Sequence, residues 1–147
     1  VLEGKIDMEH DIINIEKYTS FNPVTFENSD IVRHDQSFYG SMVYFLFVNI
    51  RGKRCLLYIG QTTRGFERTI EHEERRHIPF SDWDYIPVPF RLLDAVEKDY
   101  IREYRPILNY FNNPLYMRDE SHYIMSARQF HHAFEFLIKR INEERNK

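Results

Sequence analysis

The order of apolar and polar positions predicts a small antiparallel sheet near the middle of the chain. Residues 42–49 form a dense run of β-branched and aromatic side chains, which is typical of a buried strand. The turn signal Arg51-Gly52-Lys53 follows, and residues 54–59 then predict a second strand, so the pair forms a β-hairpin that ends at Gly60. Residues 83–88 predict a third strand, which its prolines confine to an edge of the sheet.

Helical spacing of apolar residues recurs three times after the hairpin. The first helix is expected at about residues 64–77, capped by Thr62 or Thr63, and its apolar stripe is thin. The second spans residues 90–104. The last begins near Ser126, which forms capping-box spacing with the glutamine three residues later. The first stripe is Phe66, Thr69 and Ile70; the last, which we interpret as ordinary core, is Phe130, Phe134, Leu137, Ile138 and Ile141.

These elements predict an α+β fold in which a small antiparallel sheet, a hairpin plus an edge strand, is flanked by helices. The chain divides into an acidic N-terminal arm (1–39), a core (40–113) and a C-terminal helical extension packed on that core (114–147). In the arm, an apolar cluster at residues 12–15 predicts a short helix or strand, followed by an irregular segment.

Length and composition fit one globular domain. The chain has 147 residues, and its 12 Phe and 10 Tyr argue against disorder. The single cysteine, Cys55, excludes an intrachain disulfide framework and a cysteine-rich zinc site. No apolar run reaches the ~18 residues of a membrane span, and no signal-peptide pattern opens the chain. We therefore expect a cytoplasmic, intracellular protein without a membrane partner.

Charge is distributed unevenly along the chain. The formal net charge is −3, but the first 40 residues alone carry eight acids and three bases. The remainder is mildly basic. Overall acidity disfavours strong non-specific binding to nucleic acid without excluding it, because phosphate contacts depend on local charge.

One carboxylate interrupts the apolar stripe of the second helix. Glu97 lies four residues after Leu93 and three before Tyr100, within a stripe of apolar side chains. An unpaired buried carboxylate is costly, so such a group is expected to be neutralised, paired or bound to a metal. A structural salt bridge, or a helix rotated so that Glu97 reaches water, remains an alternative.

A second pair of polar residues lies on the first helix. Arg68 and His72 are four residues apart and therefore share one helical face, opposite Phe66 and Ile70. The neighbouring acids and bases are typical of a solvated face. The pair alone can therefore be interpreted either as part of a functional site or as part of a solvated surface.

Taken in order, these residues resemble the GIY-YIG nuclease family. Tyr58-Ile59-Gly60 ends a strand, Arg68 follows the glycine by eight residues, and His72 follows Arg68 by four. The helical Glu97 then precedes the element Pro106-Ile107-Leu108-Asn109. The first tripeptide, Met42-Val43-Tyr44, keeps its tyrosine but lacks the glycine, and the 13 residues between the two tyrosines leave the hairpin register open. The resemblance covers residues 40–109, so the core is GIY-YIG-like.

The resemblance implies a role for each matching residue. Glu97 would be the single protein ligand of a Mg²⁺ ion, for which Mn²⁺ can substitute, and Arg68 would hold the scissile phosphate. Tyr58 would be the general base if cations such as Arg68, the metal or Lys53 lower its pKa, with His72 as the rival base. Tyr44 and His72 would position water and base, Gly60 belongs to the motif, and Asn109 would tie the turn after the helix to the core.

We therefore expect a metal-dependent DNA endonuclease that hydrolyses phosphodiester bonds, with a restriction-like role favoured. Lys53, Arg54 and Arg64 are candidates for contacts with DNA, and a two-fold target would require a homodimer. Two alternatives remain: a non-catalytic nucleic-acid-binding module on the same scaffold, and a nicking nuclease of the repair or phage type. An unrelated α+β interaction domain is a third.

Overall fold

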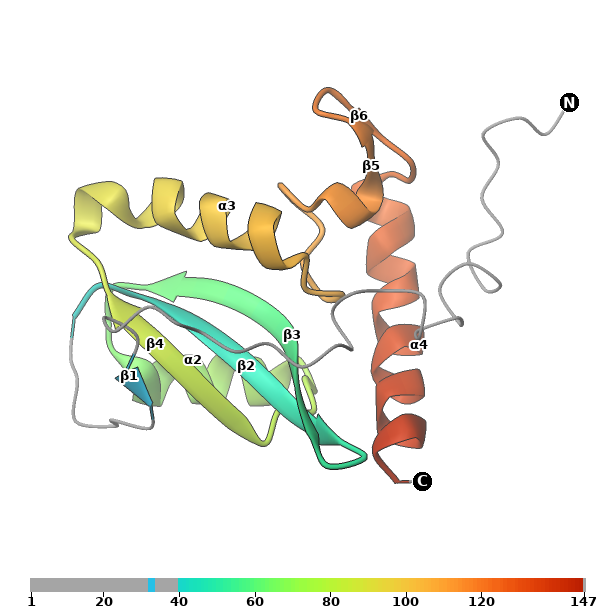
Figure 1. The fold of residues 1–147 in the computed structure, drawn as a ribbon, viewed down its shortest axis with the longest axis horizontal. Helices are drawn as coiled ribbons and strands as arrows, with labels where there is room; N and C mark the ends of the chain where they lie inside the picture. Colours follow the sequence, from blue (N-terminus) through green and yellow to red (C-terminus); the bar gives the residue numbers. More distant parts are fainter. Residues whose placement is uncertain (1–31, 34–39, 147) are drawn as a thin grey trace, which may run out of the picture.

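A four-stranded antiparallel sheet forms the centre of the computed structural model, which describes residues 32–33 and 40–146 (Figure 1). The predicted element at residues 12–15, and all of the predicted arm except residues 32–33, lie outside the described residues. The strand order is β1-β4-β2-β3. The strands are β1 (Val32–Arg33), β2 (Met42–Ile50), β3 (Lys53–Thr62) and β4 (Asp82–Pro87).

The predicted hairpin is formed by β2 and β3. Its two central residues, Arg51 and Gly52, have positive φ angles of 55° and 80°, as a type I′ turn requires. β3 runs on to Thr62 instead of ending at Gly60. A bulge lies in this strand, because Leu46 pairs with Tyr58 whereas the next residue of β2, Phe47, pairs with Leu56.

β4 is not the edge strand that its prolines suggested. It pairs with β2 on one side and with the two residues of β1 on the other. The prolines do not prevent this pairing, because the described residues of β1 pair with Asp84 and Tyr85, before Pro87 ends the strand.

Helices cover both faces of the sheet (Figure 1). α3 (Leu93–Tyr104), preceded by a 3₁₀ turn at Phe90–Leu92, packs on one face against an apolar cluster. α2 (Phe66–Arg75) and α4 (Ala127–Arg145) flank the other face. The first cluster contains Val43, Phe45, Phe47, Leu56, Ile59, Leu93 and Ile101.

The helix ends agree with the sequence in one case and differ in another. Ser126 caps α4 with the predicted capping box to Gln129. α2 is shorter than predicted, and its N-cap is Gly65 instead of Thr62 or Thr63. The sequence analysis also missed a small hairpin before α4, formed by β5 (Met117–Asp119) and β6 (His122–Tyr123) after a 3₁₀ turn at Pro114–Tyr116.

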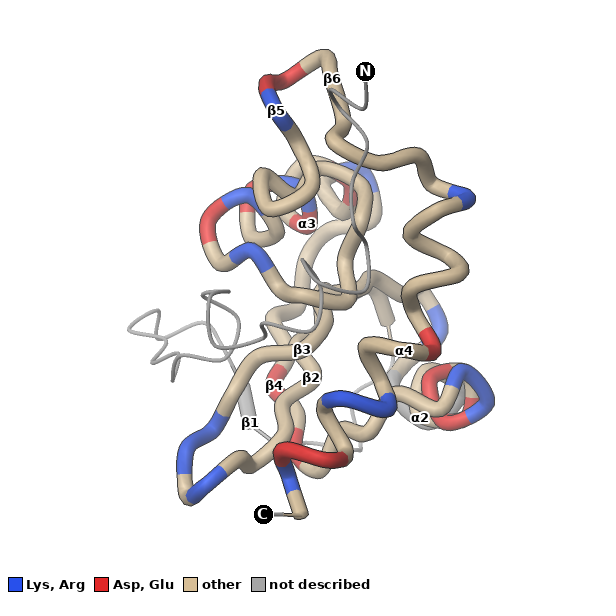
Figure 2. Tube along the Cα trace, turned by 90° about the vertical axis from the view of Figure 1, so that its right-hand side faces the viewer, with Lys and Arg blue, Asp and Glu red and all other residues tan. Residues whose placement is uncertain are grey.

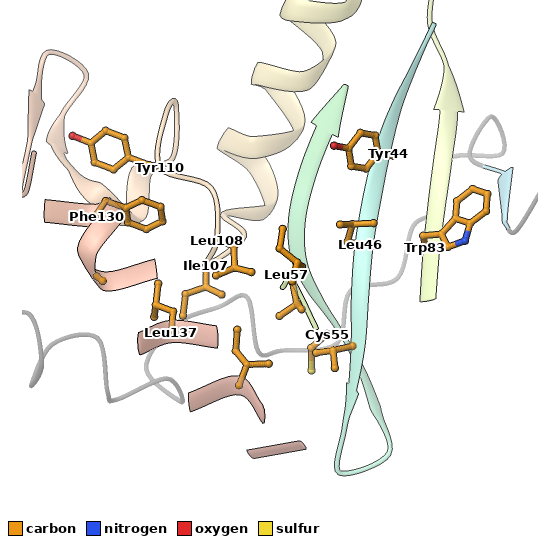
Figure 3. Close-up of a cluster of buried hydrophobic side chains, with 14 of the residues drawn as sticks. Tyr44, Leu46, Cys55, Leu57, Trp83, Ile107, Leu108, Tyr110, Phe130 and Leu137 are labelled. Atoms are coloured by element: carbon orange, nitrogen blue, oxygen red, sulfur yellow. The ribbon is translucent and has the colours of Figure 1, made fainter. Parts of the chain in front are cut away.

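α4 shares its core with the sheet. Figure 3 shows Ile107 and Leu108 between β3 and the helix, where Leu137 is fully buried. Tyr110 and Phe130 pack together beside them, with ring centroids 5.3 Å apart. Within the described residues, the helices are too short or too polar to cross a membrane.

Candidate active site

Tyr44 and Tyr58 lie on the same face of the hairpin. Their ring centroids are 6.3 Å apart, and both pack toward the core that α2 and α4 cover. The bulge before Tyr58 produces this arrangement, because it shifts the alternation of β3 by one residue. The register that the sequence left open is therefore one in which the two tyrosines are neighbours.

Gly60 is required here by the packing of Tyr44. The two residues are direct cross-strand partners. A Cβ atom on Gly60 would lie 2.3 Å from both the ζ carbon and the hydroxyl oxygen of Tyr44, far inside van der Waals contact. The glycine of the tripeptide thus leaves the space that the tyrosine ring occupies.

The sequence analysis missed a buried carboxylate on α2. Glu73 is only 1% exposed, although the charged residues around it are typical of a solvated helical face. The Tyr44 hydroxyl donates a hydrogen bond to its Oε1 at 3.2 Å, and the Arg76 guanidinium pairs with its Oε2 at 3.1 Å. The available signal was spacing, since Glu73 follows Thr69 by four residues and Ile70 by three.

Burial dominates the titration of this cluster. It raises the pKa of Glu73, although Arg76 and His72 oppose the shift. It also raises the pKa of Tyr44 well above its ordinary value, and the neighbouring Tyr58 and Glu73 add to the effect. Both hydroxyl and carboxyl groups therefore resist losing a proton in this environment.

A general base at Tyr58 would need a lowered pKa, but the pKa of Tyr58 is raised. The guanidinium carbon of Arg76 lies 5.0 Å from the centre of its ring. Burial nevertheless raises the pKa of Tyr58, with the lowering effect of Arg76 second in size. Lys53 lies at the far end of β3, five residues away and therefore roughly 17 Å along the strand, too distant to lower that pKa.

Glu97 of α3 is linked by a side-chain hydrogen bond to Gln61 of β3, the strand at one edge of the sheet as the described residues form it. Burial and the nearby Asp94 raise the pKa of Glu97 to about 7, while a hydrogen bond from the Gln61 side chain opposes the shift. Gln61 also donates to Asp94 at 2.7 Å, so it links β3 to α3. Among the side chains that the structure describes, Glu97 forms no salt bridge with a basic residue.

A cavity of about 670 Å³ joins Glu97 to Tyr58. β3, α3, the end of α2, the loop after α3 and α4 contribute its walls. The residues most relevant to chemistry in this lining are Tyr58, Arg76, Glu97, Asn109, Phe111 and Phe134. The cavity thus brings together side chains from both sides of the sheet edge.

Asn109 fixes one wall of this cavity to β3. Its side-chain oxygen accepts a hydrogen bond from the Ile59 N–H at 2.8 Å, and its amide nitrogen donates to the Ile59 carbonyl at 2.8 Å. The side chain is buried. The segment after α3 is therefore held against the residue that follows Tyr58.

Of the Arg68–His72 pair, the structure describes only the His72 side chain, which lies near Glu73. The His72 side chain is 68% exposed, and its Nε2 lies 3.7 Å from Glu73 Oε1. His72 is not part of the cavity lining given by the described residues. Arg68 lies in α2 one turn before His72, and its side chain is outside the described part of the structure.

Two of the basic residues considered for DNA contacts, Lys53 and Arg54, begin β3 at the tip of the hairpin, and neither lines the cavity. Figure 2 shows basic positions at the turn between β2 and β3. Arg54 pairs with both Asp82 and Asp84, and its guanidinium lies 3.5 Å from the centre of the Phe47 ring. Lys53 is exposed. Arg64 is also exposed, in the segment between β3 and α2, where its backbone N–H donates to Thr62 Oγ1 at 3.1 Å.

Among the described residues, a metal ion would have fewer than three protein ligands of the usual kinds. Within the described residues, no three His, Cys, Asp or Glu side chains gather as a metal site. Mg²⁺ commonly binds through one or two carboxylates and keeps several waters, so Glu97 beside a cavity fits that donor set. Glu73 does not, because its oxygens are occupied by Tyr44 and Arg76.

Comparison of the chain with protein-family models, with curated proteins and with solved structures finds no match. A Ser121–His122–Asp119 cluster in the β5–β6 turn is not a catalytic triad, because both Ser121 and Asp119 contact the same ring nitrogen, Nδ1 of His122.

Proposed function

We propose that the protein is a metal-dependent DNA endonuclease of the GIY-YIG type, which hydrolyses phosphodiester bonds. The observation that carries the proposal is the shared cavity: Tyr58 and Glu97 are 39 residues apart in sequence and line it together with Arg76. Half-buried carboxylates with raised pKa values, beside a cavity, are typical of functional sites.

Glu97 is the proposed ligand of the metal ion. A bound Mg²⁺ ion neutralises charge on a phosphate and stabilises the leaving oxygen. Because the pKa of Glu97 is about 7, protons compete with the ion near neutral pH. We therefore expect metal affinity to rise as the pH rises through 7.

Arg76 is the proposed second cation for the phosphate, in addition to Arg68. Its guanidinium is held by Glu73 at 3.1 Å and lies against the ring of Tyr58. A guanidinium has five N–H donors, so those not used by Glu73 can bind a phosphate oxygen that enters the cavity. The pair with Glu73 fixes the direction of those donors.

The proton-transfer role fits His72 better than Tyr58. Burial raises the pKa of Tyr58, so its phenol keeps the proton and is suited to donate a hydrogen bond to phosphate or to the attacking water. The imidazole of His72 is exposed and has the Glu73 carboxylate 3.7 Å from its Nε2. That separation is too long for a hydrogen bond, and His72 does not line the cavity as the described residues define it, so His72 would accept the proton of the attacking water through intervening water.

The test is cleavage of supercoiled plasmid in Mg²⁺, with EDTA as the metal-free arm. Glu97→Gln is expected to reduce the rate at least about 100-fold, since metal stabilisation of charge contributes several kcal/mol. Glu103→Gln is the matched control, because Glu103 is an exposed carboxylate on the same helix, outside the cavity lining. Cleavage by Glu97→Gln at the wild-type rate would contradict the assignment.

The products distinguish the roles left open by the sequence. Discrete bands would indicate a restriction-like enzyme, for which a homodimer on a two-fold target is expected. Nicks or a smear would indicate a repair or degradative enzyme. Binding of DNA without cleavage in Mg²⁺ or Mn²⁺ would support the non-catalytic module instead.

A further inference from the structure

We infer that the cavity beside Tyr58 and Glu97 is a subsite for one unpaired nucleotide, so the preferred DNA has an unpaired or flipped-out base beside the scissile phosphate. The inference names the substrate of the proposed nuclease site and therefore rests on that proposed function. It adds a binding role for the walls that α4 and the loop after α3 contribute.

The size of the cavity fits one nucleotide. Its volume of about 670 Å³ falls within the roughly 300–1,000 Å³ of sites that enclose small ligands. A single base with its sugar can enter such a space, whereas a paired base remains joined to its partner in the duplex stack. Enzymes that act within enclosed sites accordingly take bases out of the duplex or use single strands.

The cavity wall offers an aromatic surface for a base. Phe111 lines it and is 65% exposed, which is unusual for a large apolar side chain. Tyr110, which also lines the cavity, contacts Phe111 edge to face, with ring centroids 5.0 Å apart. A supported and exposed aromatic ring at a cavity wall is the arrangement on which unpaired bases stack.

A cation held by protein contacts lines the same cavity. The guanidinium carbon of Arg76 is 5.0 Å from the centre of the Tyr58 ring and 5.1 Å from the centre of the Phe134 ring. Arg76 therefore lies between the β3 wall and the α4 wall. A nucleotide with its base toward Phe111 would have a cation within the same cavity for its phosphate.

Phe90 provides a matched control for Phe111. It is 74% exposed, at the 3₁₀ turn before α3, and it does not line this cavity. Both side chains are exposed phenyl rings, so alanine substitution removes similar apolar area from each. Only the Phe111 substitution should affect a bound nucleotide.

The experiment measures binding in EDTA, so it does not require cleavage. The probes are a single-stranded hexanucleotide containing one 2-aminopurine, a hairpin duplex with 2-aminopurine paired, and the same hairpin with 2-aminopurine opposite an abasic site. Stacking should quench the fluorescence of the first and third probes but not the second. Phe111→Ala should weaken binding of the quenched probes about tenfold, whereas Phe90→Ala should leave it unchanged.

Phe111→Tyr keeps an aromatic ring and should restore binding. If only the hexanucleotide is quenched, the site takes single strands; if the abasic hairpin is quenched as well, it also takes a base flipped from a duplex. Equal quenching of paired and unpaired probes, or equal effects of Phe111→Ala and Phe90→Ala, would overturn the inference. If either of these overturning results came with Glu97-dependent plasmid cleavage, the subsite would be wrong and the proposed nuclease would stand. Selective quenching of the unpaired probes without any cleavage would support the subsite and contradict the nuclease.

Discussion

The two ends of the β2–β3 hairpin differ in the environment of their ionisable side chains. At the tip (residues 50–55), both arginines are matched by acids from elsewhere in the chain, whereas Lys53 is exposed: Arg51 pairs with Glu144, and Arg54 with Asp82 and Asp84. At the open end (residues 42–46 and 58–62), Tyr44 and Tyr58 have pKa values raised by burial and lie near a cavity or in its wall.

The difference separates residues that stabilise the fold from residues suited to chemistry. Paired charges at the tip have their partners within the protein, so little of their binding capacity remains for a ligand. Next to the open end, Glu97 of α3 has no basic partner among the described side chains. The Gln61 amide compensates in part for its burial, and the pKa of Glu97 is raised to about 7. A metal ion would supply the missing positive charge, which is the reason for assigning function to this end.

The largest expected effect on stability lies at the tip. Arg54→Ala removes the partner of two carboxylates, one of which, Asp84, is buried. We expect the free energy of unfolding to fall by about 3 kcal/mol, measured by urea denaturation at pH 7. Arg54→Lys retains the charge but not the two-sided hydrogen bonding, so it should recover part of the loss. An unchanged unfolding midpoint for Arg54→Ala would contradict the structural role of the tip.

Each end of the hairpin contains a glycine, and alanine should destabilise the protein at each for a different physical reason. Gly60→Ala places a Cβ atom 2.3 Å from the Tyr44 ring, and we expect a loss of about 2 kcal/mol together with displacement of that ring. Gly52→Ala meets no atom within 4 Å, but its φ of 80° should cost about 1 kcal/mol. Combining Gly60→Ala with Tyr44→Ala should recover stability relative to the sum of the single changes, whereas Gly52→Ala and Tyr44→Ala should add. Additive values for the Gly60 pair would show that Tyr44 does not require the glycine.

These positions also show what the sequence could predict. Local signals were sufficient for the hairpin, for α3 and for the capping box at Ser126, because each depends on neighbouring residues. Glu97 was identifiable because it interrupts an apolar stripe within a single helix. In these cases the periodicity or the cap is complete within one segment, so no knowledge of tertiary packing was needed.

The remaining features depend on segments that are distant in sequence. The burial of Glu73 follows from a contact with Tyr44, 29 residues earlier, and an acid on a charged helix gave little indication of it. The pairing of β4 with β1, and the contribution of α4 to the cavity, also require the assembled fold. Tertiary packing thus decided which of the many acids became buried and which helix enclosed the site.

A smaller effect is expected in the pH dependence of stability. The carboxyl group of Glu97 ordinarily titrates near 4.5, but in the folded protein its pKa is about 7. Between these values the folded state binds more protons than the unfolded state, so the contribution of Glu97 to stability is lost as the pH rises through 7. The melting temperature of wild type should fall by a few degrees relative to Glu97→Gln between pH 5 and pH 8. Parallel melting profiles for the two proteins would contradict the raised pKa.

The smallest expected effect concerns Lys53. The sequence suggested a DNA contact, but Lys53 lies at the tip, roughly 17 Å along β3 from Tyr58. Lys53→Ala should leave affinity for a hexanucleotide within about twofold of wild type, measured by fluorescence anisotropy at 0.15 M salt. A loss greater than tenfold would extend the DNA-binding surface to the tip.

We assign chemistry to the open end of the hairpin and maintenance of the fold to its tip. The most direct measurement is the initial rate of DNA strand cleavage in Mg²⁺, expressed per folded molecule, for wild type, Glu97→Gln and Arg54→Lys in parallel. The account predicts a loss of at least about 100-fold for Glu97→Gln and the wild-type rate for Arg54→Lys. Wild-type cleavage by Glu97→Gln, or inactivity of folded Arg54→Lys, would contradict it.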